Sequence, residues 1–244
     1  MIGLPDGVAA CLFDLDGVLT STATLHEIAW QRTFDAFLAT RTDGDRAPFT
    51  KHDYTAFVDG RPRADGVRTF LTSRGIRLPE GEPDDTPDAA TVNGVGNRKN
   101  EALLALIDER GIQPYPGSVA YLNAARDAGL KIGVVTSSAN GEHVLDVADL
   151  AEFVQARVDG ITIADEHLRG KPAPDSFLAG ARALGVAPSE AAVFEDALSG
   201  VEAGRAGGFR YVVGVNRADQ AEQLRDHGAD VVVDDLADLL GGSR

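Results

Sequence analysis

Short apolar runs alternate with amphipathic segments through the second half of the chain, and this alternation constrains the fold most strongly. We expect strands at residues 130–135, 191–194, 211–215 and 229–233. We expect helices at residues 118–128, 142–149, 175–184, 198–206 and 220–226. Strands that alternate with helices are typical of a doubly wound, mostly parallel sheet. The sequence therefore predicts an α/β fold with a Rossmann-type core.

A further apolar run near the N-terminus leads into a pair of acids. The run Val8–Leu12 has no polar interruption, which predicts a strand buried on both faces. It continues into Asp14-Leu15-Asp16-Gly17, where the two carboxylates point the same way if the chain stays extended. Neighbouring acids disfavour each other's charge unless a cation binds, and Mg²⁺ prefers oxygen ligands. A simple turn would also explain Asp-x-Asp-Gly, because Asp and Gly are common turn residues.

Other polar residues follow the predicted strands or lie on loops that reach the same edge. Ligands of such sheets bind beyond the carboxyl ends of the strands. A turn with hydroxyls and backbone N–H groups, residues 136–140, follows one strand and suits a phosphate. The residues of this turn that we expect to bind the phosphate or substrate are Thr136, Ser137 and Asn140. Glu195 and Asp196 follow another strand, and prolines stiffen the loop around Lys171.

Residues 21–100 interrupt the alternation and read as an inserted α-helical cap. Apolar residues of 30–38 recur at helical spacing, a break near residues 60–63 divides a second helical stretch, and residues 78–88 form an acidic, Pro-rich loop. We therefore predict a catalytic core of residues 1–20 and 101–244 and a cap of residues 21–100. Hinges are expected near residues 21–22 and 94–97.

Three kinds of cationic or titratable side chain mark this cap. Arg61 and Arg63 flank the helical break and suit phosphate oxygens, although two solvated arginines remain an open alternative. Lys99 is expected at a helix start, where its charge is unfavourable unless an anion binds. His26 lies in the first turn of the first cap helix, and its proton chemistry near neutral pH makes it a candidate.

Composition excludes some classes of function. The formal net charge of −15 argues against a nucleic-acid or anionic-membrane binder. Cys11 is the only cysteine, so an intrachain disulfide is impossible, which fits a reducing cytoplasm. We see neither a signal peptide nor an apolar run long enough to span a bilayer. We therefore expect a cytoplasmic protein, and a monomer is the default expectation.

The polar motifs, taken in order, resemble those of the haloacid dehalogenase-like superfamily. They are Asp14-Leu15-Asp16-Gly17, Thr136-Ser137-Ser138, Lys171-Pro172 and Glu195-Asp196. Within the superfamily the likeness is strongest to the β-phosphoglucomutases, through residues 16–23 with His26 and Trp30, residues 97–101 and residues 170–175.

This resemblance implies a role for each acid. Asp14 would be the nucleophile that becomes an aspartyl phosphate, and Asp16 the general acid and base. Mg²⁺ would be held by the Asp14 carboxylate, the Asp16 backbone carbonyl and Asp196. Glu195 would lie beside the ion.

The resemblance also assigns the cations and the substrate, a small sugar phosphate. Thr136, Ser137 and Lys171 would hold the transferring phosphoryl group. Arg63 and Lys99 would bind the distal phosphate and the sugar. His26 would help to align Asp16.

The activity implied is a Mg²⁺-dependent interconversion of β-glucose 1-phosphate and glucose 6-phosphate through glucose 1,6-bisphosphate. A sugar-phosphate phosphatase on the same scaffold is the alternative. A non-catalytic phosphosugar-binding protein is less favoured, because nucleophile and metal ligands are all present. The chain departs from the family pattern at Ala139, where β-phosphoglucomutases carry a lysine, and at Ser21, where some carry an aspartate.

Overall fold

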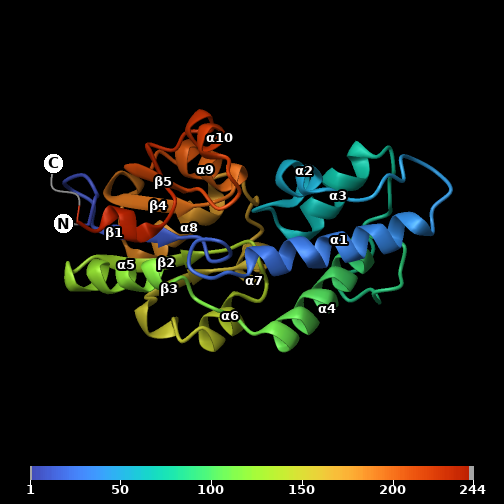
Figure 1. The fold of residues 1–244 in the computed structure, drawn as a ribbon, viewed down its shortest axis with the longest axis horizontal. Coiled ribbons are helices and arrows are strands. Elements are labelled where there is room, and N and C mark those ends of the chain that lie inside the picture. The colour runs from blue at the N-terminus through green and yellow to red at the C-terminus, as the bar shows by residue number, and fades with distance from the viewer. Residues whose placement is uncertain (1, 242–244) are drawn as a thin grey trace. The chain divides into compact units, whose positions relative to one another are not determined.

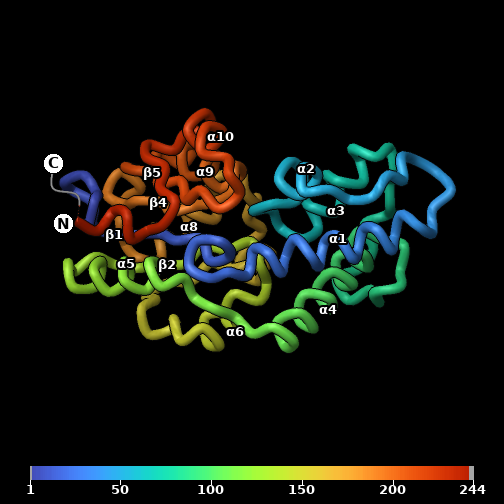
Figure 2. Tube along the Cα trace, in the orientation of Figure 1, coloured from blue at the N-terminus to red at the C-terminus, as the bar shows by residue number. Residues whose placement is uncertain are grey.

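The computed structural model describes residues 2–241 and contains two compact units. The first unit holds the chain up to Ser21 and from Ile112 onward, and the second holds Thr22–Gly111. The tube in Figure 2 follows the chain out of the first unit after its first strand and back into it before the remaining strands. Within residues 2–241, no helix has the length and apolar character needed to cross a membrane.

The described part of the first unit contains a six-stranded parallel sheet, with strand order β3-β2-β1-β4-β5-β6 (Figure 1). The strands are β1 (Ala10–Phe13), β2 (Lys131–Val135), β3 (Ala156–Val158), β4 (Ala191–Glu195), β5 (Tyr211–Val215) and β6 (Val231–Val233). All five strand pairs are parallel. The predicted doubly wound α/β fold is confirmed.

Helices follow the strands in alternation. They are α5 (Pro116–Asp127), α6 (Gly141–Val147), α7 (Gly160–Asp165), α8 (Asp175–Leu184), α9 (Leu198–Ala206) and α10 (Ala221–Asp226). Side chains of β1 alternate between two layers, as the period of a strand requires. Leu12 lies in the cluster that includes Phe177 of α8. On the other layer, Tyr121 of α5 meets Phe13 and Phe194, with ring centroids 6.1 and 5.2 Å away.

The second unit is helical around an aromatic core. Its elements are α1 (Ala23–Ala39), α2 (Lys51–Asp53), the π-helical turn Tyr54–Val58, α3 (Arg63–Ser73) and α4 (Val92–Arg110). Phe34 is fully buried, with Trp30 stacked on it at 4.9 Å and Phe70 at 4.2 Å between ring centroids. The predicted helical stripe therefore forms the core of this unit.

Helix α4 begins earlier than the sequence suggested. Thr91 caps it, accepting a hydrogen bond from the Gly94 backbone N–H at 3.0 Å. Lys99 consequently lies inside the helix, and the expectation of a cation at a helix start was wrong. The glycines concealed this start, because their low helix propensity argues for a loop. The expected boundary at residue 100 and the expected hinge at 94–97 both lie within this helix.

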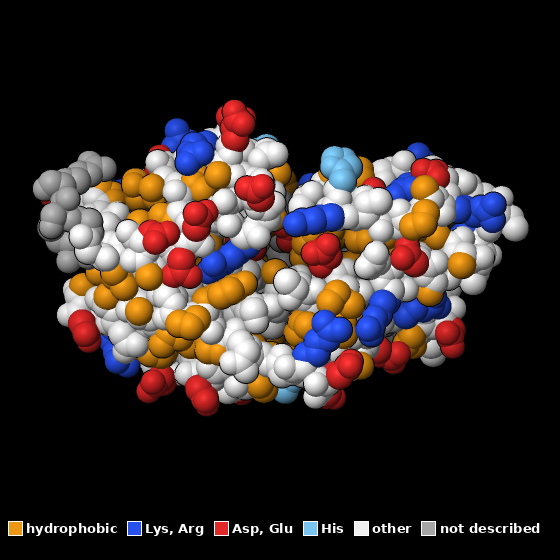
Figure 3. Space-filling view, in the orientation of Figure 1, with side chains coloured by type: hydrophobic (Ala, Val, Ile, Leu, Met, Phe, Trp, Pro, Cys, Tyr) orange, Lys and Arg blue, Asp and Glu red, His pale blue; other side chains and the backbone are white. Residues whose placement is uncertain are grey.

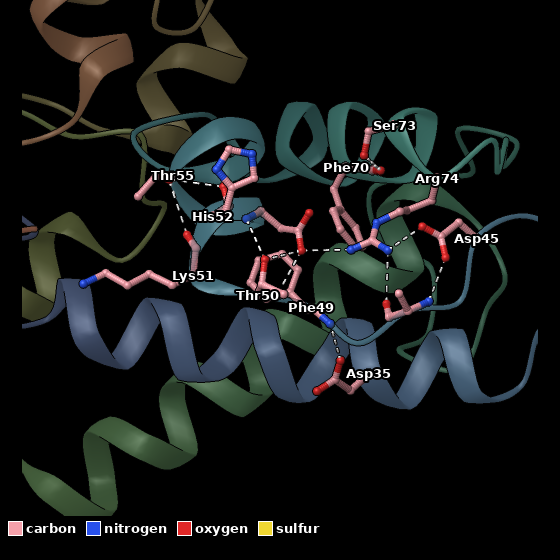
Figure 4. Close-up of polar contacts among 12 residues, drawn as sticks. Asp35, Asp45, Phe49, Thr50, Lys51, His52, Thr55, Phe70, Ser73 and Arg74 are labelled. Atoms are coloured by element: carbon pink, nitrogen blue, oxygen red, sulfur yellow. Dashed lines mark hydrogen bonds and ion pairs between the residues drawn. The ribbon is translucent and has the colours of Figure 1, made fainter. Parts of the chain in front are cut away.

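Arg74, at the end of α3, fixes the loop that precedes α2 (Figure 4). Its guanidinium lies 2.8 Å from the Asp53 carboxylate and 2.9 Å from that of Asp45, and it donates to the Ala47 carbonyl at 3.2 Å. Asp53 also forms a capping box with Thr50. Because the Arg74 and Asp53 side chains are each only 9% exposed, removing one leaves a desolvated charge behind.

We expect Arg74→Met to destabilise the second unit by about 2 kcal/mol, the usual scale for orphaning a mostly buried ion-pair partner. The only tryptophan, Trp30, lies in the core of this unit, so its fluorescence during urea unfolding reports on it. Arg77→Met, at an exposed position nearby, is the matched control. Equal unfolding midpoints for the two variants would contradict a structural role for the Arg74 network.

Candidate functional site

The predicted acids gather at the carboxyl edge of the sheet, around its central strand. Strand β1 lies between β2 and β4, and the Asp14 N–H extends the ladder by donating to the Phe194 carbonyl at 2.9 Å. Thr136 follows β2, while Glu195 ends β4 and Asp196 comes next. Parallel pairing therefore brings residues that are far apart in sequence to one place.

Lys171 lies at the centre of this group. Its ammonium nitrogen is 2.6 Å from Asp14 Oδ1 and 2.5 Å from Glu195 Oε1, and it donates to the Val135 carbonyl at 3.0 Å. The side chain is buried, and the nitrogen lies 4.8 Å from the centroid of the Phe177 ring. Three acceptors match the three N–H donors of an ammonium group.

Negative charge exceeds positive charge in this buried group. Asp14, Glu195 and Asp196 are all buried, and each offers an oxygen within 4.8 Å of the others. Burial raises the pKa of Asp14 well above its usual value, and although Lys171 opposes this shift, the Glu195 and Asp16 charges add to it. Burial lowers the pKa of Lys171, but its attraction to Asp14 and Glu195 outweighs burial and the net shift is upward. The group is thus short of positive charge.

The oxygen atoms of these acids fit a hard divalent cation. Carboxylate and carbonyl oxygens are the ligands that Mg²⁺ prefers, and its charge would offset the excess of buried acid. Glu195 already accepts from Lys171 through Oε1 and from the Ala197 N–H at 3.1 Å through Oε2. Both Glu195 oxygens are thus hydrogen-bonded and hold Lys171 and the Ala197 N–H, and Asp14, Glu195 and Asp196 together could hold the ion.

Two glycines allow the acids to approach this closely. Gly17 has a φ of 97°, and a Cβ atom there would overlap the Asp196 carboxylate. A Cβ atom on Gly200, in α9, would overlap the Glu195 carboxylate. Both positions therefore require glycine, and Gly17 requires it for conformation as well.

Asp16 lies beside the predicted phosphate turn. The Thr136 hydroxyl donates to Asp16 Oδ2 at 3.1 Å and accepts from the Ser138 N–H at 3.0 Å. The Asn140 N–H donates to the Ser138 hydroxyl at 3.2 Å, which closes the turn before α6. Ser137 lies within this turn, so Thr136, Ser137 and Asn140 all occupy the expected edge of the sheet.

The second unit assembles part of the predicted cap site. Lys99 of α4 is buried, with its nitrogen 3.1 Å from His26 Nδ1 and 5.1 Å from the centroid of the Trp30 ring. An ammonium group only donates, so Nδ1 of His26 must accept and its ring proton belongs on Nε2. His26 and Lys99 were predicted separately, and the structure brings them into contact.

Arg63 lies near the same face of α4. Its side chain crosses Gly96, where an added Cβ would be 3.2 Å from Arg63 Cγ, and residues 96 and 99 are neighbours on a helix surface. Burial lowers the pKa of Arg63, and within residues 2–241 its side chain makes no hydrogen bond or ion pair. A half-buried guanidinium without a counter-charge is suited to binding an anion. For Arg61 the structure gives a backbone hydrogen bond to Val58.

Comparison with known proteins identifies the fold family. A model of the haloacid dehalogenase-like hydrolase family matches residues 8–208. The chain belongs to the haloacid dehalogenase-like family. It is 58% identical to the β-phosphoglucomutase of Mycobacterium tuberculosis, over 98% of this chain and 94% of that protein. It is 31% identical to the β-phosphoglucomutase of Bacillus subtilis, over 94% and 91% of the two chains.

A solved structure supports the same fold. The β-phosphoglucomutase of Clostridium difficile superimposes with a TM-score of 0.76, over 96% of this chain and 94% of that one, at 24% identity. The resemblance inferred from the motifs of this haloacid dehalogenase-like protein is thereby confirmed for its family and fold.

One loop beside this haloacid dehalogenase-like site was not predicted from the sequence. Residues 216–220 follow β5, and the Gln220 side chain donates to the Asp196 carbonyl at 2.9 Å. The only indication in the sequence was their position, because these residues, like the predicted site residues, come directly after a predicted strand.

The charge imbalance predicts an unusual effect of Asp14→Asn on stability. A carboxyl whose pKa is higher in the native than in the unfolded state contributes its full stability below its unfolded pKa, and this contribution is lost as the pH rises through the native pKa. In metal-free buffer near about pH 7, we therefore expect Asp14→Asn to raise the free energy of unfolding, on the order of 1 kcal/mol.

This advantage should shrink as the pH falls, because wild-type Asp14 then takes up a proton in the native state. The difference in the free energy of unfolding is measured by urea unfolding in the presence of a chelator, with circular dichroism as the signal. Asp6→Asn, at an exposed position in the same unit, provides the control. A loss of stability in Asp14→Asn at neutral pH would contradict the proposed excess of buried negative charge.

Proposed function

We propose that this protein is a Mg²⁺-dependent β-phosphoglucomutase. It would interconvert β-glucose 1-phosphate and glucose 6-phosphate through an aspartyl-phosphate enzyme and glucose 1,6-bisphosphate. The observation that carries the proposal is the 58% identity to a β-phosphoglucomutase along nearly the whole of both chains. The arrangement of Asp14, Asp16 and Lys171 supports it independently.

In the proposed reaction Asp14 attacks the phosphorus atom of a bound phosphate. Its approach is opposed by charge repulsion, since both the carboxylate and the phosphate are anionic. Lys171, 2.6 Å from Asp14, supplies fixed positive charge, and the N–H groups of the turn at residues 136–140 can receive phosphate oxygens. Bound Mg²⁺ would supply further positive charge at Asp14 and Asp196.

Asp16 performs the proton transfers. It protonates the sugar oxygen that leaves phosphorus, and it later removes the proton from the sugar hydroxyl that attacks the aspartyl phosphate. The hydrogen bond from Thr136 at 3.1 Å restrains one oxygen of Asp16. One side chain therefore serves as acid in one half-reaction and as base in the other.

A mutase must bind phosphate at two places, because the bisphosphate turns around between the half-reactions. The proposed second place is the group of cap cations, with Arg63 as the phosphate ligand and Lys99 as a partner of the sugar or its phosphate. His26, which accepts from Lys99, would orient that ammonium group. The shortage of counter-charge around Arg63 supports this assignment.

The second candidate is a sugar-phosphate phosphatase. It would share the first half-reaction, after which water rather than a sugar hydroxyl would attack the phosphoryl group on Asp14. The matched family model carries the description of a hydrolase, and Ala139 leaves this position of the phosphate turn without a cation. A non-catalytic phosphosugar-binding role is disfavoured, since nucleophile, acid and cation are all present.

The direct test is to supply β-glucose 1-phosphate with Mg²⁺ and a trace of glucose 1,6-bisphosphate. We expect glucose 6-phosphate to form, with little free phosphate, and Asp14→Asn to abolish turnover because the nucleophile is lost. A coupled dehydrogenase assay measures the first product and a molybdate assay the second. Free phosphate without glucose 6-phosphate would establish the phosphatase instead.

Lys99→Met separates the two candidates at the cap. For a mutase we expect kcat/KM to fall about 100-fold, as a charge-assisted contact to a phosphate or sugar is lost. Lys51→Met, which removes an exposed lysine of the same unit, should change little. A phosphatase would retain most of its turnover on a small phosphate ester in Lys99→Met, and an unchanged kcat/KM on β-glucose 1-phosphate would count against the mutase.

A further inference from the structure

Two side chains of the loop after β5 reach back to the catalytic edge. Arg217 donates through Nε to the Gly17 carbonyl at 2.9 Å, and Gln220 donates through Nε2 to the Asp196 carbonyl at 2.9 Å. Neither side chain touches a carboxylate of the acid group through these bonds. Both act on the backbone of the segments that carry the acids.

The two carbonyls belong to segments that are in contact. Gly17 follows Asp16 directly, and its α-carbon approaches the Asp196 carboxylate so closely that a Cβ would overlap it. The segment with Asp14 and Asp16 therefore packs against the segment with Asp196. The spacing between these segments fixes the distance between the two proposed metal ligands.

The loop that provides the two donors is itself fixed. Asn216 accepts from the Gln220 N–H at 2.8 Å and donates to the Asp234 carboxylate at 2.9 Å. The Arg217 guanidinium donates to the Asp234 carbonyl at 2.9 Å and lies 3.7 Å from the centroid of the Tyr115 ring. The loop is thus anchored on the end of β6 and cannot easily follow a displaced acid segment.

The Arg217 guanidinium also forms an ion pair with the Asp235 carboxylate, whose oxygen lies 3.5 Å from Nη2. Its hydrogen bond to the Gly17 carbonyl restrains the position of the segment that carries Asp14 and Asp16. Gln220 is neutral, and its amide is buried. A charged guanidinium and a neutral amide thus each restrain one backbone carbonyl, that of Gly17 and that of Asp196.

We propose that Arg217 and Gln220 are positioning residues that hold the two acid segments at the spacing a divalent cation requires. This proposal rests on the proposed function only in that Mg²⁺ binds between Asp14 and Asp196. Partners outside the ligand sphere commonly change metal affinity by about 10- to 100-fold, because they fix the orientation of the ligands. The loop after β5 therefore tunes the affinity of the site without touching the ion.

Calorimetric titration of the full-length protein with MgCl₂ tests the proposal. We expect Gln220→Met and Arg217→Met each to raise the Kd for Mg²⁺ about 10-fold, and Gln223→Met and Arg225→Met to leave it within about twofold. The control residues are exposed positions of α10 that undergo the same chemical changes. Activity of the two loop variants should recover at saturating Mg²⁺.

A merely structural role would lower the stability of the metal-free variants and leave the Kd of the folded protein unchanged. Circular dichroism of each sample therefore accompanies the titration. If Arg217→Met does not fold, Gln220→Met decides the question, and Arg217→Lys, which keeps one donor, should bind Mg²⁺ more tightly than Arg217→Met if both fold. Wild-type binding with unchanged Kd values in the loop variants would overturn the inference, whereas failure of the wild type to bind Mg²⁺ would overturn the proposed function as well.

Discussion

The structure depends on one buried ammonium group between two buried carboxylates. Lys171 satisfies Asp14 and Glu195 at 2.6 and 2.5 Å, and without it the two acids could not share the end of the sheet. Asp196 is a third buried carboxylate of the same group. The three carboxylates outnumber the one ammonium group, and this excess of negative charge favours the binding of a cation.

The fold is what makes such an arrangement possible. A parallel sheet ends all its strands at one edge, so that acids from β1 and β4 and a hydroxyl from β2 meet without any close relation in sequence. Glycine at positions 17 and 200 then removes the side chains that would hold the carboxylates apart. The loop after β5 restrains the same segments through their carbonyls. The negative charge of this group would attract a cation, and the backbone would set where it binds.

The sequence predicted which polar residues meet at the carboxyl edge of the sheet, because strand, turn and polar side chain follow one another in a recognisable order. It did not predict β3 or α7, since a three-residue edge strand has too few positions to show a period. It placed the start of α4 too late, because glycines at 94 and 96 suggest a loop. It also missed Arg217 and Gln220, whose partners are backbone carbonyls that every residue possesses. Contacts of this kind require coordinates.

The most direct test of the central claim is the number of protons released when Mg²⁺ binds. Titrations in buffers of different ionisation enthalpy give this number. Burial and the neighbouring acids raise the pKa of Asp14, so an ion that binds this carboxylate competes with a proton for it. We expect proton release from the wild type to increase as the pH is lowered from about 8 to about 6. Binding heats that do not depend on the buffer anywhere in this range would contradict the claim.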